Sequence, residues 1–340
     1  MTSETRSGAE LAQADEPPRR GAGRRFPDLR VDRFSGLYLL VLLAIGYTVW
    51  LPQTFGTTTN LRAVLAGSAI TGIIALGAMM GLVSGAFDVS VAANMSLAIS
   101  LVGWLQSVAH LGFAVAVVIT LASGVVVGSL NALIITRLRV DPVIATLGMT
   151  SLLAAVSYWI AGGRTFITGI SPAFTALGAT KIATVPLPVF YLGGIALVLW
   201  YFLDHTPVGR YLYAAGSNPT AAGLAGLPVR RLQWTALIVS GTLSSVAGIV
   251  LTMQLGAASF GSGGPYLLPA FAAAFLGSTQ IRPGRFNVAG TLVALYLLAV
   301  GVKGLQLRFP ALPWIADLFQ GVALIAAVAL GVLATRGRRE

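Results

Sequence analysis

The chain has 340 residues, of which 56% are hydrophobic and 10% are charged, and it contains no cysteine. Soluble domains carry about 25% charged residues, so the composition excludes an ordinary water-soluble protein and indicates a polytopic membrane protein in contact with lipid. The 22 Lys and Arg against 11 Asp and Glu give a net charge of +11. Most of the basic residues lie in short connections beside apolar runs, which is a topology signal rather than a nucleic-acid-binding surface.

Residues 1–33 open the chain with seven Arg and six acidic residues, and they show no apolar periodicity. This composition predicts a disordered basic tail, whose arginines favour contact with anionic headgroups on the cytoplasmic side. An ordinary secretory signal is not expected, because no apolar stretch of the right length with a cleavage site follows the first charges. A second, short basic tail is expected at 335–340, which leaves 34–334 as the membrane domain.

The uncharged intervals predict the membrane spans, because a helix needs roughly 20 apolar residues to cross the hydrocarbon core. They give an all-α bundle of about ten transmembrane helices, with broken helices and probable internal repeats. Their approximate positions are 34–51, 62–88, two within 89–136 that separate at 110–112, 142–163, 186–203, 233–255, 266–276, 286–302 and 312–334. The connection 164–181 is expected to be an external loop with a short interfacial helix.

One internal echo accompanies these spans. The segments Gly85-Ala-Phe-Asp-Val and Gly284-Arg-Phe-Asn-Val each follow one expected span and open the next. Transporter folds are commonly built from repeats, but in a chain with 40 Gly a match of this length is equally compatible with chance.

The distribution of Lys and Arg predicts the orientation. Ten spans place both termini on one side, and the segments on that side carry 17 of the 22 basic residues, against 5 on the other. The positive-inside rule therefore predicts that both termini and the connection 205–232 lie in the cytoplasm.

The connection 205–232 is the longest polar segment between spans and is called the docking loop below. Asn218 suits an N-cap, Pro219 suits the first helical position, and Gly226 suits a helix end. A helix of under three turns is therefore expected between them. The stretch 211–229 has no charge at all, which fits a surface buried in another protein better than a solvated loop.

No enzyme motif is present. The sequence has no GxxxxGK[ST] phosphate loop, no GxSxG and no HExxH, and its two histidines, His110 and His205, fall at opposite expected membrane faces. We therefore expect no ATPase site, catalytic site, metal or cofactor in this chain.

Asp88, in SGAFDVSV at 84–91, is the main candidate for a charge at membrane depth, where charges are costly and usually functional. It can line or gate a pathway, or it can cap the helix that follows, because Asp favours the N-cap position; of the two we favour the cap. Asp141 is expected to cap a helix and to form a surface ion pair with Arg137 or Arg139.

Uncharged polar residues within the spans form a second group of candidates. Their hydroxyl and amide groups can hydrogen-bond a hydroxylated solute, or they can join neighbouring helices, which is the commoner role. With Asp88, the candidates for a translocation pathway are Ser90, Asn94, Asn131, Thr146 and Gln254, and Ser240 is a further polar position of this kind.

Four segments together carry a family resemblance: SGAFDVSV at 84–91, LNALIITRLRVDPVIATLGMTS at 130–151, AAGSNPTAAGLAGLPVRR at 214–231 and SSVAGIVLTMQLGAA at 244–258. With them the chain resembles, over 61–333, the permease subunits of bacterial ATP-binding-cassette importers of the ribose, xylose and furanosyl-autoinducer type. The third segment is the most specific. In that family it looks like the cytoplasmic loop that docks on the nucleotide-binding subunit.

The resemblance implies a pair of permeases, identical or related, around one pathway in the bacterial inner membrane. Two ATP-binding cassette subunits would bind ATP and Mg on the cytoplasmic side, and an extracytoplasmic solute-binding protein would deliver a small neutral sugar such as a pentose. The implied docking residues are Gly216, Asn218, Pro219, Ala221, Ala222, Leu224 and Gly226. The family's GGIDLSVG appears here as Gly85-Ala-Phe-Asp-Val-Ser-Val-Ala92, with two glycines lost, so the pathway surface is expected to differ.

Two other functional classes stay open on the sequence alone. A transporter driven by H⁺ or Na⁺ would explain ten spans, but it usually needs ionisable groups at mid-membrane, and few are present. A membrane enzyme needs a catalytic constellation that the sequence lacks. The permease subunit of an ATP-driven sugar importer is therefore the expected function.

Overall fold

A computed structural model of the chain describes residues 31–336, with side chains for residues 34–329. The predicted tails at 1–33 and 335–340 lie outside the residues whose side chains are described, although the backbone of α1 already begins at Val31 and that of α13 continues to Arg336.

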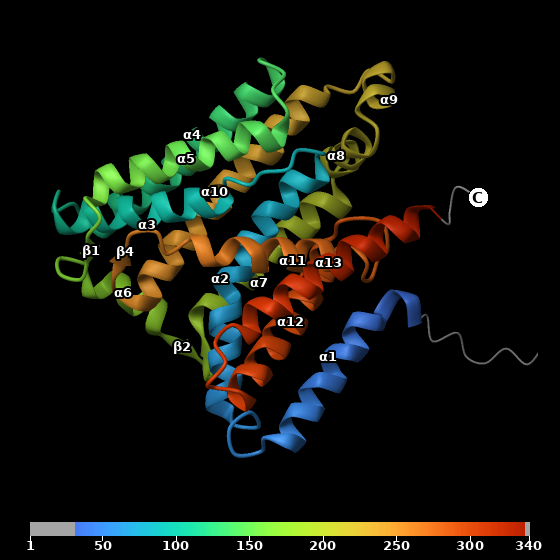
Figure 1. The fold of residues 1–340 in the computed structure, drawn as a ribbon. Coiled ribbons are helices and arrows are strands. Elements are labelled where there is room, and N and C mark those ends of the chain that lie inside the picture. Colours follow the sequence, from blue (N-terminus) through green and yellow to red (C-terminus); the bar gives the residue numbers. More distant parts are fainter. Residues whose placement is uncertain (1–30, 337–340) are drawn as a thin grey trace, which may run out of the picture. The chain divides into compact units, whose positions relative to one another are not determined.

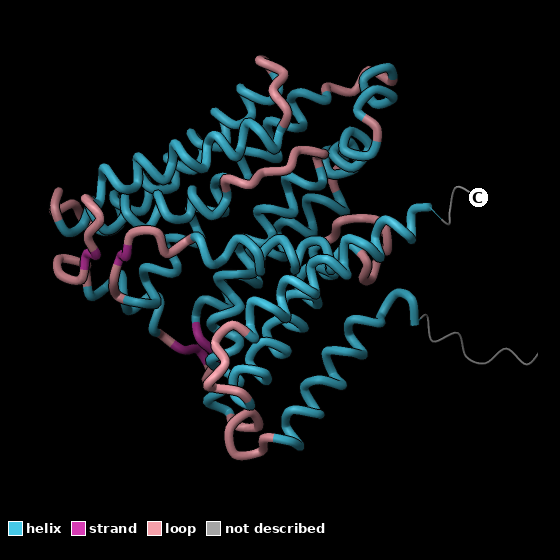
Figure 2. Tube along the Cα trace, viewed as in Figure 1, coloured by secondary structure: helices cyan, strands magenta, loops and turns pink. Residues whose placement is uncertain are grey.

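Helices account for nearly all regular structure in the described residues (Figures 1 and 2). In chain order the elements are α1 (Val31–Trp50), α2 (Thr58–Val83), α3 (Val91–Ser107), α4 (Phe113–Thr136), α5 (Pro142–Ala161), β1 (Thr165–Phe166), α6 (Pro172–Ala179), β2 (Lys181–Ile182), β3 (Val185–Pro186), α7 (Leu187–His205), α8 (Pro207–Ser217), α9 (Pro219–Leu224), α10 (Val229–Leu255), β4 (Ala258–Ser259), the 3₁₀ helix η1 (Gly264–Tyr266), α11 (Leu267–Ser278), α12 (Val288–Arg308) and α13 (Ile315–Arg336).

A helix lies at each of the ten positions at which a span is expected, namely α1 to α5, α7 and α10 to α13. Six of them, α2, α4, α5, α7, α10 and α12, are long and apolar enough to cross a membrane. The apolar parts of α1, α3, α11 and α13 are shorter. The prediction of an all-α polytopic membrane protein is thus confirmed at this level.

The helices α2 and α10 lie side by side at the centre of the bundle, and both are largely buried. We call α2–α5 the first half of the bundle and α10–α13 the second half. Each central helix packs against the second and third helix of the other half: α2 contacts α11 and α12, and α10 contacts α3 and α4. Within each half the next contacts also correspond, since α3 packs on α5 and α11 packs on α13. The packing therefore repeats α2–α5 as α10–α13.

The echo between Gly85 and Gly284 does not mark this repeat. Gly85 precedes α3 and Gly284 precedes α12, and these helices hold different places in the two halves. The repeat is visible in the packing, whereas the short sequence match falls on positions that do not correspond.

Small residues allow a close contact between α4 and α10. A side chain at Gly128 would collide with the carbonyl oxygen of Leu237, and one at Gly241 would collide with that of Gly124. Glycine is required at these places because the two backbones touch, as in many membrane helix pairs. Glycines thus let α4 and α10 pack backbone against backbone.

The two ends of the bundle differ. At one end β1 pairs with β4, β2 pairs with β3, and α6 packs on the end of α10. The helix α6 is the short helix expected within 164–181. At the other end lie α8, α9, the loop between α2 and α3, the end of α4 and the loop between α11 and α12, which are joined by the contacts described below; this is called the α8–α9 end.

Candidate functional site

The docking loop forms two consecutive helices, α8 and α9. The expected cap is present: Asn218 Oδ1 accepts a hydrogen bond from the Ala221 N–H at 3.0 Å, and Pro219 is the first helical residue. Gly226 follows the helix with a φ of 81°, which favours glycine. The predicted short helix is thus confirmed, whereas α8 is an additional helix within what reads as a polar loop.

The docking loop exposes an apolar, uncharged surface. Leu224 is 87% exposed, and Asn218, Pro219, Ala221 and Gly226 are exposed beside it. Ala222 differs from them, because it is 6% exposed and belongs to the protein's own core. The structure therefore places Ala222 inside the chain rather than on the surface that a partner could contact.

Gly216, at the end of α8, lies against the loop between α2 and α3. A side chain there would collide with the carbonyl oxygen of Val83, and a side chain at Gly85 would lie 3.4 Å from Gly216 Cα. Only glycine fits so close a backbone contact. The docking loop is thereby in direct contact with the loop that carries Asp88.

Asp88 is the centre of a buried polar cluster that joins the loop between α2 and α3 to α4 and α10. Its Oδ1 accepts hydrogen bonds from the Ser90 hydroxyl at 2.6 Å, the Ser90 N–H at 3.1 Å and Asn131 Nδ2 on α4 at 3.3 Å. Its Oδ2 accepts one from the Ser240 hydroxyl on α10 at 2.9 Å. Asp88 itself is 1% exposed. Four donors therefore replace water around a carboxylate that has no basic partner within the described residues.

The interpretation of Asp88 as the N-cap of α3 is wrong. The helix begins at Val91, its N-cap is Ser90, and no side chain caps it. The Asp88 carboxylate instead bridges to α4 and α10. By contrast, Asp141 does cap α5, through Val143 N–H and Ile144 N–H. The ion pair expected for it does not form, because the described residues hold a single ion pair, elsewhere in the chain.

Two further predicted residues belong to the same region. Thr146 Oγ1, on α5, accepts a hydrogen bond from the Val89 N–H at 3.1 Å. Asn94 Nδ2, on α3, donates to the Gly241 carbonyl at 2.8 Å. The Oδ1 atoms of Asn94 and Asn131 are buried without a hydrogen-bond partner.

Gln254 lies apart from this cluster. It is fourteen residues beyond Ser240 on α10, a distance of roughly 21 Å along the helix. It sits at the end of α10 where α6 packs. The structure thus brings together five of the six predicted pathway residues and separates Gln254 from them.

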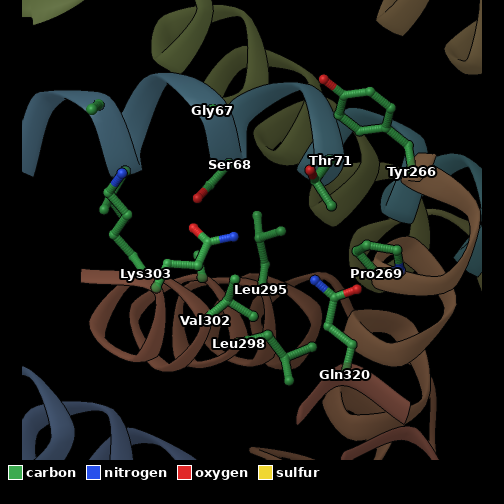
Figure 3. Close-up of a pocket in the computed structure, with 14 residues that line it drawn as sticks. Gly67, Ser68, Thr71, Tyr266, Pro269, Leu295, Leu298, Val302, Lys303 and Gln320 are labelled. Carbon is green, nitrogen blue, oxygen red and sulfur yellow. The ribbon is translucent and has the colours of Figure 1, made fainter. Parts of the chain in front are cut away.

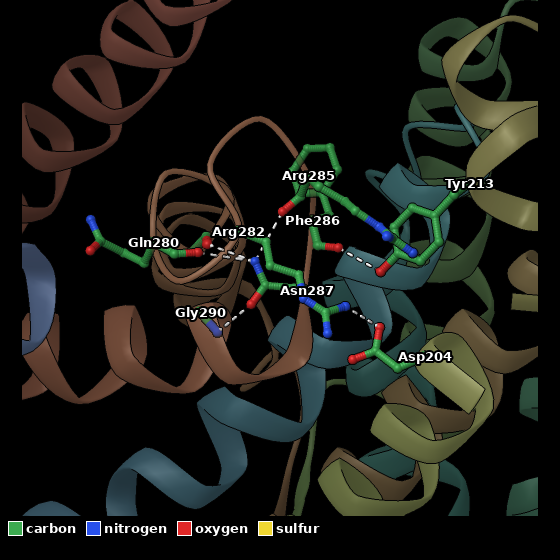
Figure 4. A network of polar contacts seen from close by, with 9 residues as sticks. Asp204, Tyr213, Gln280, Arg282, Arg285, Phe286, Asn287 and Gly290 are labelled. Atoms are coloured by element: carbon green, nitrogen blue, oxygen red, sulfur yellow. Dashed lines mark hydrogen bonds and ion pairs between the residues drawn. The ribbon is translucent and has the colours of Figure 1, made fainter. Parts of the chain in front are cut away.

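A second set of contacts joins the docking loop to the loop between α11 and α12 (Figure 4). The Tyr213 hydroxyl, on α8, donates to the Phe286 carbonyl at 2.7 Å, and the Arg285 guanidinium lies 3.4 Å from the centre of the Tyr213 ring. Arg282 forms an ion pair with Asp204 at the end of α7. Burial raises the pKa of the Tyr213 hydroxyl, and the nearby Arg285 partly opposes this shift.

Asn287 stabilises the conformation of the loop between α11 and α12. Its Nδ2 donates to the carbonyls of Gly277, Gln280 and Arg285, and its Oδ1 accepts from the Gly290 N–H at 2.7 Å. Sequence reasoning missed this network. The available signal was the unusually polar segment LGSTQIRPGRFN at 276–287. It contains Asn287 and three of the four residues to which Asn287 bonds.

A cavity of about 480 Å³ lies between α2, α12, the start of α11 and α13 (Figure 3). Eight of its fourteen lining residues are apolar or glycine, and it is called the polar cavity below for the six that carry polar groups. Ser68 and Thr71 on α2 and Gln320 on α13 point into the same space. Its polar lining is completed by Tyr266, Lys303 and Gln306. None of these six residues was predicted, because each is a single polar residue in an apolar helix or at a helix end.

No group of three or more His, Asp or Glu that could hold a metal ion occurs among the described residues. The features that the structure describes are the exposed, uncharged surface of α9, the buried polar cluster around Asp88 and a cavity between helices.

Residues 60–328 match the family described as "Branched-chain amino acid transport system / permease component". The chain belongs to this permease family. Because the match covers most of the membrane bundle, including α9 and the Asp88 cluster, these features belong to the family's own domain. The permease is therefore a multi-pass membrane transport subunit, and the sequence-based recognition of an importer permease is confirmed.

Several curated relatives resemble this permease over most of its length. The ribose import permease protein RbsC of Escherichia coli (strain K12) is 32% identical over 306 residues, which cover 89% of this chain and 93% of the relative. The autoinducer 2 import system permease protein LsrD of Photorhabdus temperata is 31% identical over 76% of this chain and 78% of its own. The D-allose transport system permease protein AlsC of E. coli (strain K12) is 25% identical over 90% and 93%. No solved structure matches this permease.

Proposed function

We propose that this permease is the membrane subunit of an ATP-driven importer and forms the pathway for a small neutral sugar such as a pentose or a related monosaccharide. The observation that carries the proposal is the docking loop. It combines an exposed, uncharged, capped helix with backbone contact to the buried core of the bundle. The alternative of an ion-driven transporter gives such a surface no role.

The choice of solute rests on chemistry and on the relatives. Three of them are named for ribose, autoinducer 2 and D-allose, whereas the family description names branched-chain amino acids. The polar cavity has an apolar wall with hydroxyl and amide groups and one cation, Lys303, and these polar groups can hydrogen-bond a polyhydroxylated solute. We therefore propose that this cavity lies on the route of the sugar.

The orientation follows from charge. We place the α8–α9 end in the cytoplasm of a bacterial inner membrane, because the positive-inside rule favours the side with more Lys and Arg. The polar cavity then lies toward the extracytoplasmic side, since Lys303 and Gln306 are near the end of α12 at which Arg308 lies. A solute-binding protein would deliver the sugar from that side.

The docking residues would bind a separate ATP-binding cassette subunit, which would hold the ATP and Mg. In this proposal Asn218, Pro219, Ala221, Leu224 and Gly226 form the contact surface. Gly216 and Ala222 act differently: Gly216 transmits movement to the loop of Asp88, and Ala222 keeps α9 packed on the permease.

The Asp88 cluster would relay this movement. Asp88, Ser90, Asn131 and Thr146 tie the loop after α2 to α4, α5 and α10, so that a push on the loop is shared by these helices. The unpartnered Oδ1 atoms of Asn94 and Asn131 are buried acceptors, which a solute hydroxyl would reach only after the helices around them move apart. Gln254 would lie near the extracytoplasmic end of the pathway. A second permease, identical or related, would complete that pathway.

The test is uptake into proteoliposomes that contain the permease with its cassette subunit, its solute-binding protein and radiolabelled ribose. Replacement of Leu224 by Glu should abolish ATP-dependent uptake and co-purification of the cassette subunit, because a buried carboxylate without a partner is costly. The matched control is Ile182→Glu, which changes an exposed apolar residue at the other end. Normal uptake by Leu224→Glu would overturn the docking role. Uptake driven by an ion gradient without ATP would establish the alternative function.

A further inference from the structure

A cationic cleft lies at the α8–α9 end, between the end of α4 and the start of α10. It measures about 610 Å³ and is lined by Arg137, Arg230, Arg231, Thr136 and Trp234. Trp234 Nε1 donates a hydrogen bond to Thr136 Oγ1 at 2.8 Å, which fixes the indole against α4. The cleft is thus held open by two helices and presents three guanidinium groups.

These three charges are not neutralised within the described residues. No carboxylate lines the cleft, and the single ion pair of the described chain joins Arg282 to Asp204. Arg137, Arg230 and Arg231 are all exposed. Guanidinium groups bind phosphate through paired, charge-assisted hydrogen bonds, so the cleft suits a phosphate group.

An apolar groove of about 820 Å³ lies beside it, between α4, α7 and α10. Its walls are aliphatic and aromatic side chains such as Leu121, Phe190, Ile195, Phe202 and Met253, and side-chain hydroxyls occur in it only at Tyr191 and Thr235. The groove belongs to helices that cross the membrane, so hydrocarbon is the surrounding medium.

One face of α10 connects the cleft to the groove. Arg231 lines the cleft, whereas Thr235 and Val239 line the groove, and the spacing of four residues puts all three on the same face. Thr235 Oγ1 also donates to the Arg231 carbonyl at 3.0 Å. From Thr235 to Met253 the groove follows α10 for roughly 27 Å, close to the hydrocarbon thickness of about 30 Å.

We propose that the cleft and the groove together form a binding site for one anionic phospholipid. The phosphate binds Arg137, Arg230 and Arg231, Trp234 lies at the level of the headgroups, and an acyl chain fills the groove. The combination decides the occupant. A soluble phosphate would leave the groove empty, and a helix of a second permease would leave three arginines without partners. Basic pockets between membrane helices are suited to anionic headgroups. The site does not depend on the transport direction or on ATP.

The test uses the full permease purified in a neutral detergent, with phosphatidylglycerol or phosphatidylcholine of the same chain length added, and measures bound lipid by native mass spectrometry. Phosphatidylglycerol should be retained preferentially. The triple variant Arg137→Gln, Arg230→Gln, Arg231→Gln should lose this preference by about 100-fold, since each basic residue near an anionic lipid contributes about 1 kcal/mol. The matched control neutralises Arg62, Arg164 and Arg308 at the other end and should keep it.

The groove is tested separately with Val239→Trp, which fills it and leaves the three arginines in place. Retention of phosphatidylglycerol should fall for this variant, while its thermal unfolding in detergent shows that it is folded. Equal retention of the two lipids by the unaltered permease would overturn the proposal. Displacement of the lipid by glycerol 3-phosphate at equal concentration would also overturn it, because this result indicates a free-anion site. A third contrary result is that the cassette subunit or a second permease, and not the lipid, protects the three arginines from chemical modification.

Discussion

At the scale of single residues, Asp88 shows how this bundle tolerates a charged group. A carboxylate that is removed from water must recover its hydrogen bonds from the protein, and two serines and one asparagine supply them here. These donors come from two helices and one loop. The carboxylate thereby joins the loop after α2 to α4 and α10. This role in packing can be tested separately from any role in transport.

Replacement of Asp88 by Asn is expected to destabilise the permease by about 1 to 3 kcal/mol. The new amide puts an N–H group opposite one of the donors that now bond to the carboxylate, so at least one buried donor loses its acceptor. Thermal unfolding of the purified protein measures this change.

Asp141→Asn is the control, because Asn also caps helices and the stability should stay within about 0.5 kcal/mol. If Asp88→Asn unfolds like the unaltered permease but transports nothing, the charge acts in transport and the packing role assigned to it is wrong.

At the scale of elements, α8 is held from two sides. Gly216 contacts the loop after α2, and Tyr213 bonds to the loop before α12. A force on α9 therefore reaches both halves of the repeated bundle through one short helix. A change in α8 is therefore expected to affect the coupling of ATP hydrolysis to transport more than the stability of the permease.

Tyr213→Phe should lower the amount of sugar moved per ATP hydrolysed, and leave cassette binding unchanged. The variant keeps the ring beneath Arg285 but loses the hydrogen bond to the Phe286 carbonyl, so α8 is attached to that loop less firmly. The measurement compares ATP hydrolysis with uptake in proteoliposomes. Tyr211→Phe, an exposed tyrosine on the same helix, is the control and should behave as the unaltered protein. An unchanged ratio in both variants would remove Tyr213 from the coupling route.

The sequence predicts α9 because its signals are local: Asn218 caps, Pro219 starts and Gly226 ends the helix. The same kind of signal was available for α8, where Thr206 caps the helix and Pro207 begins it. The Asp88 cluster differs, because Asn131 and Ser240 lie 43 and 152 positions away along the chain. No local sequence pattern shows that such distant residues are in contact. Each of them could therefore be predicted as a candidate site residue, but the hydrogen bonds between them could not be predicted.

At the scale of the whole molecule, the positions of the helices could be predicted and their packing could not. Charges interrupt the apolar runs, so the runs can be counted. Which helices are central is not visible in the sequence, because lipid and protein interiors are equally apolar and a spanning helix needs no polar face. Only the structure shows that α2 and α10 are enclosed, whereas α4, α5 and α7 expose much of their surface.

The absence of cysteine makes the orientation directly testable. A single cysteine at Leu224 is expected to react with a membrane-impermeant maleimide only after cells are opened, because the proposed topology places the docking loop in the cytoplasm. A single cysteine at Ile182 should react in intact cells, and serves as the opposite reference. The converse labelling pattern would invert the proposed topology and place the docking loop where no ATP is available.

The glycine contact between α4 and α10 limits how this permease can move. Two backbones that touch cannot slide past each other without a collision, so these helices must travel as one rigid body during a transport cycle. Helices can then move relative to each other only where longer side chains separate their backbones, as they do around α7. An enlarged residue at Gly241 should consequently separate the pair and leave a transporter that folds poorly, whereas enlargement along α7 should alter the speed of the cycle.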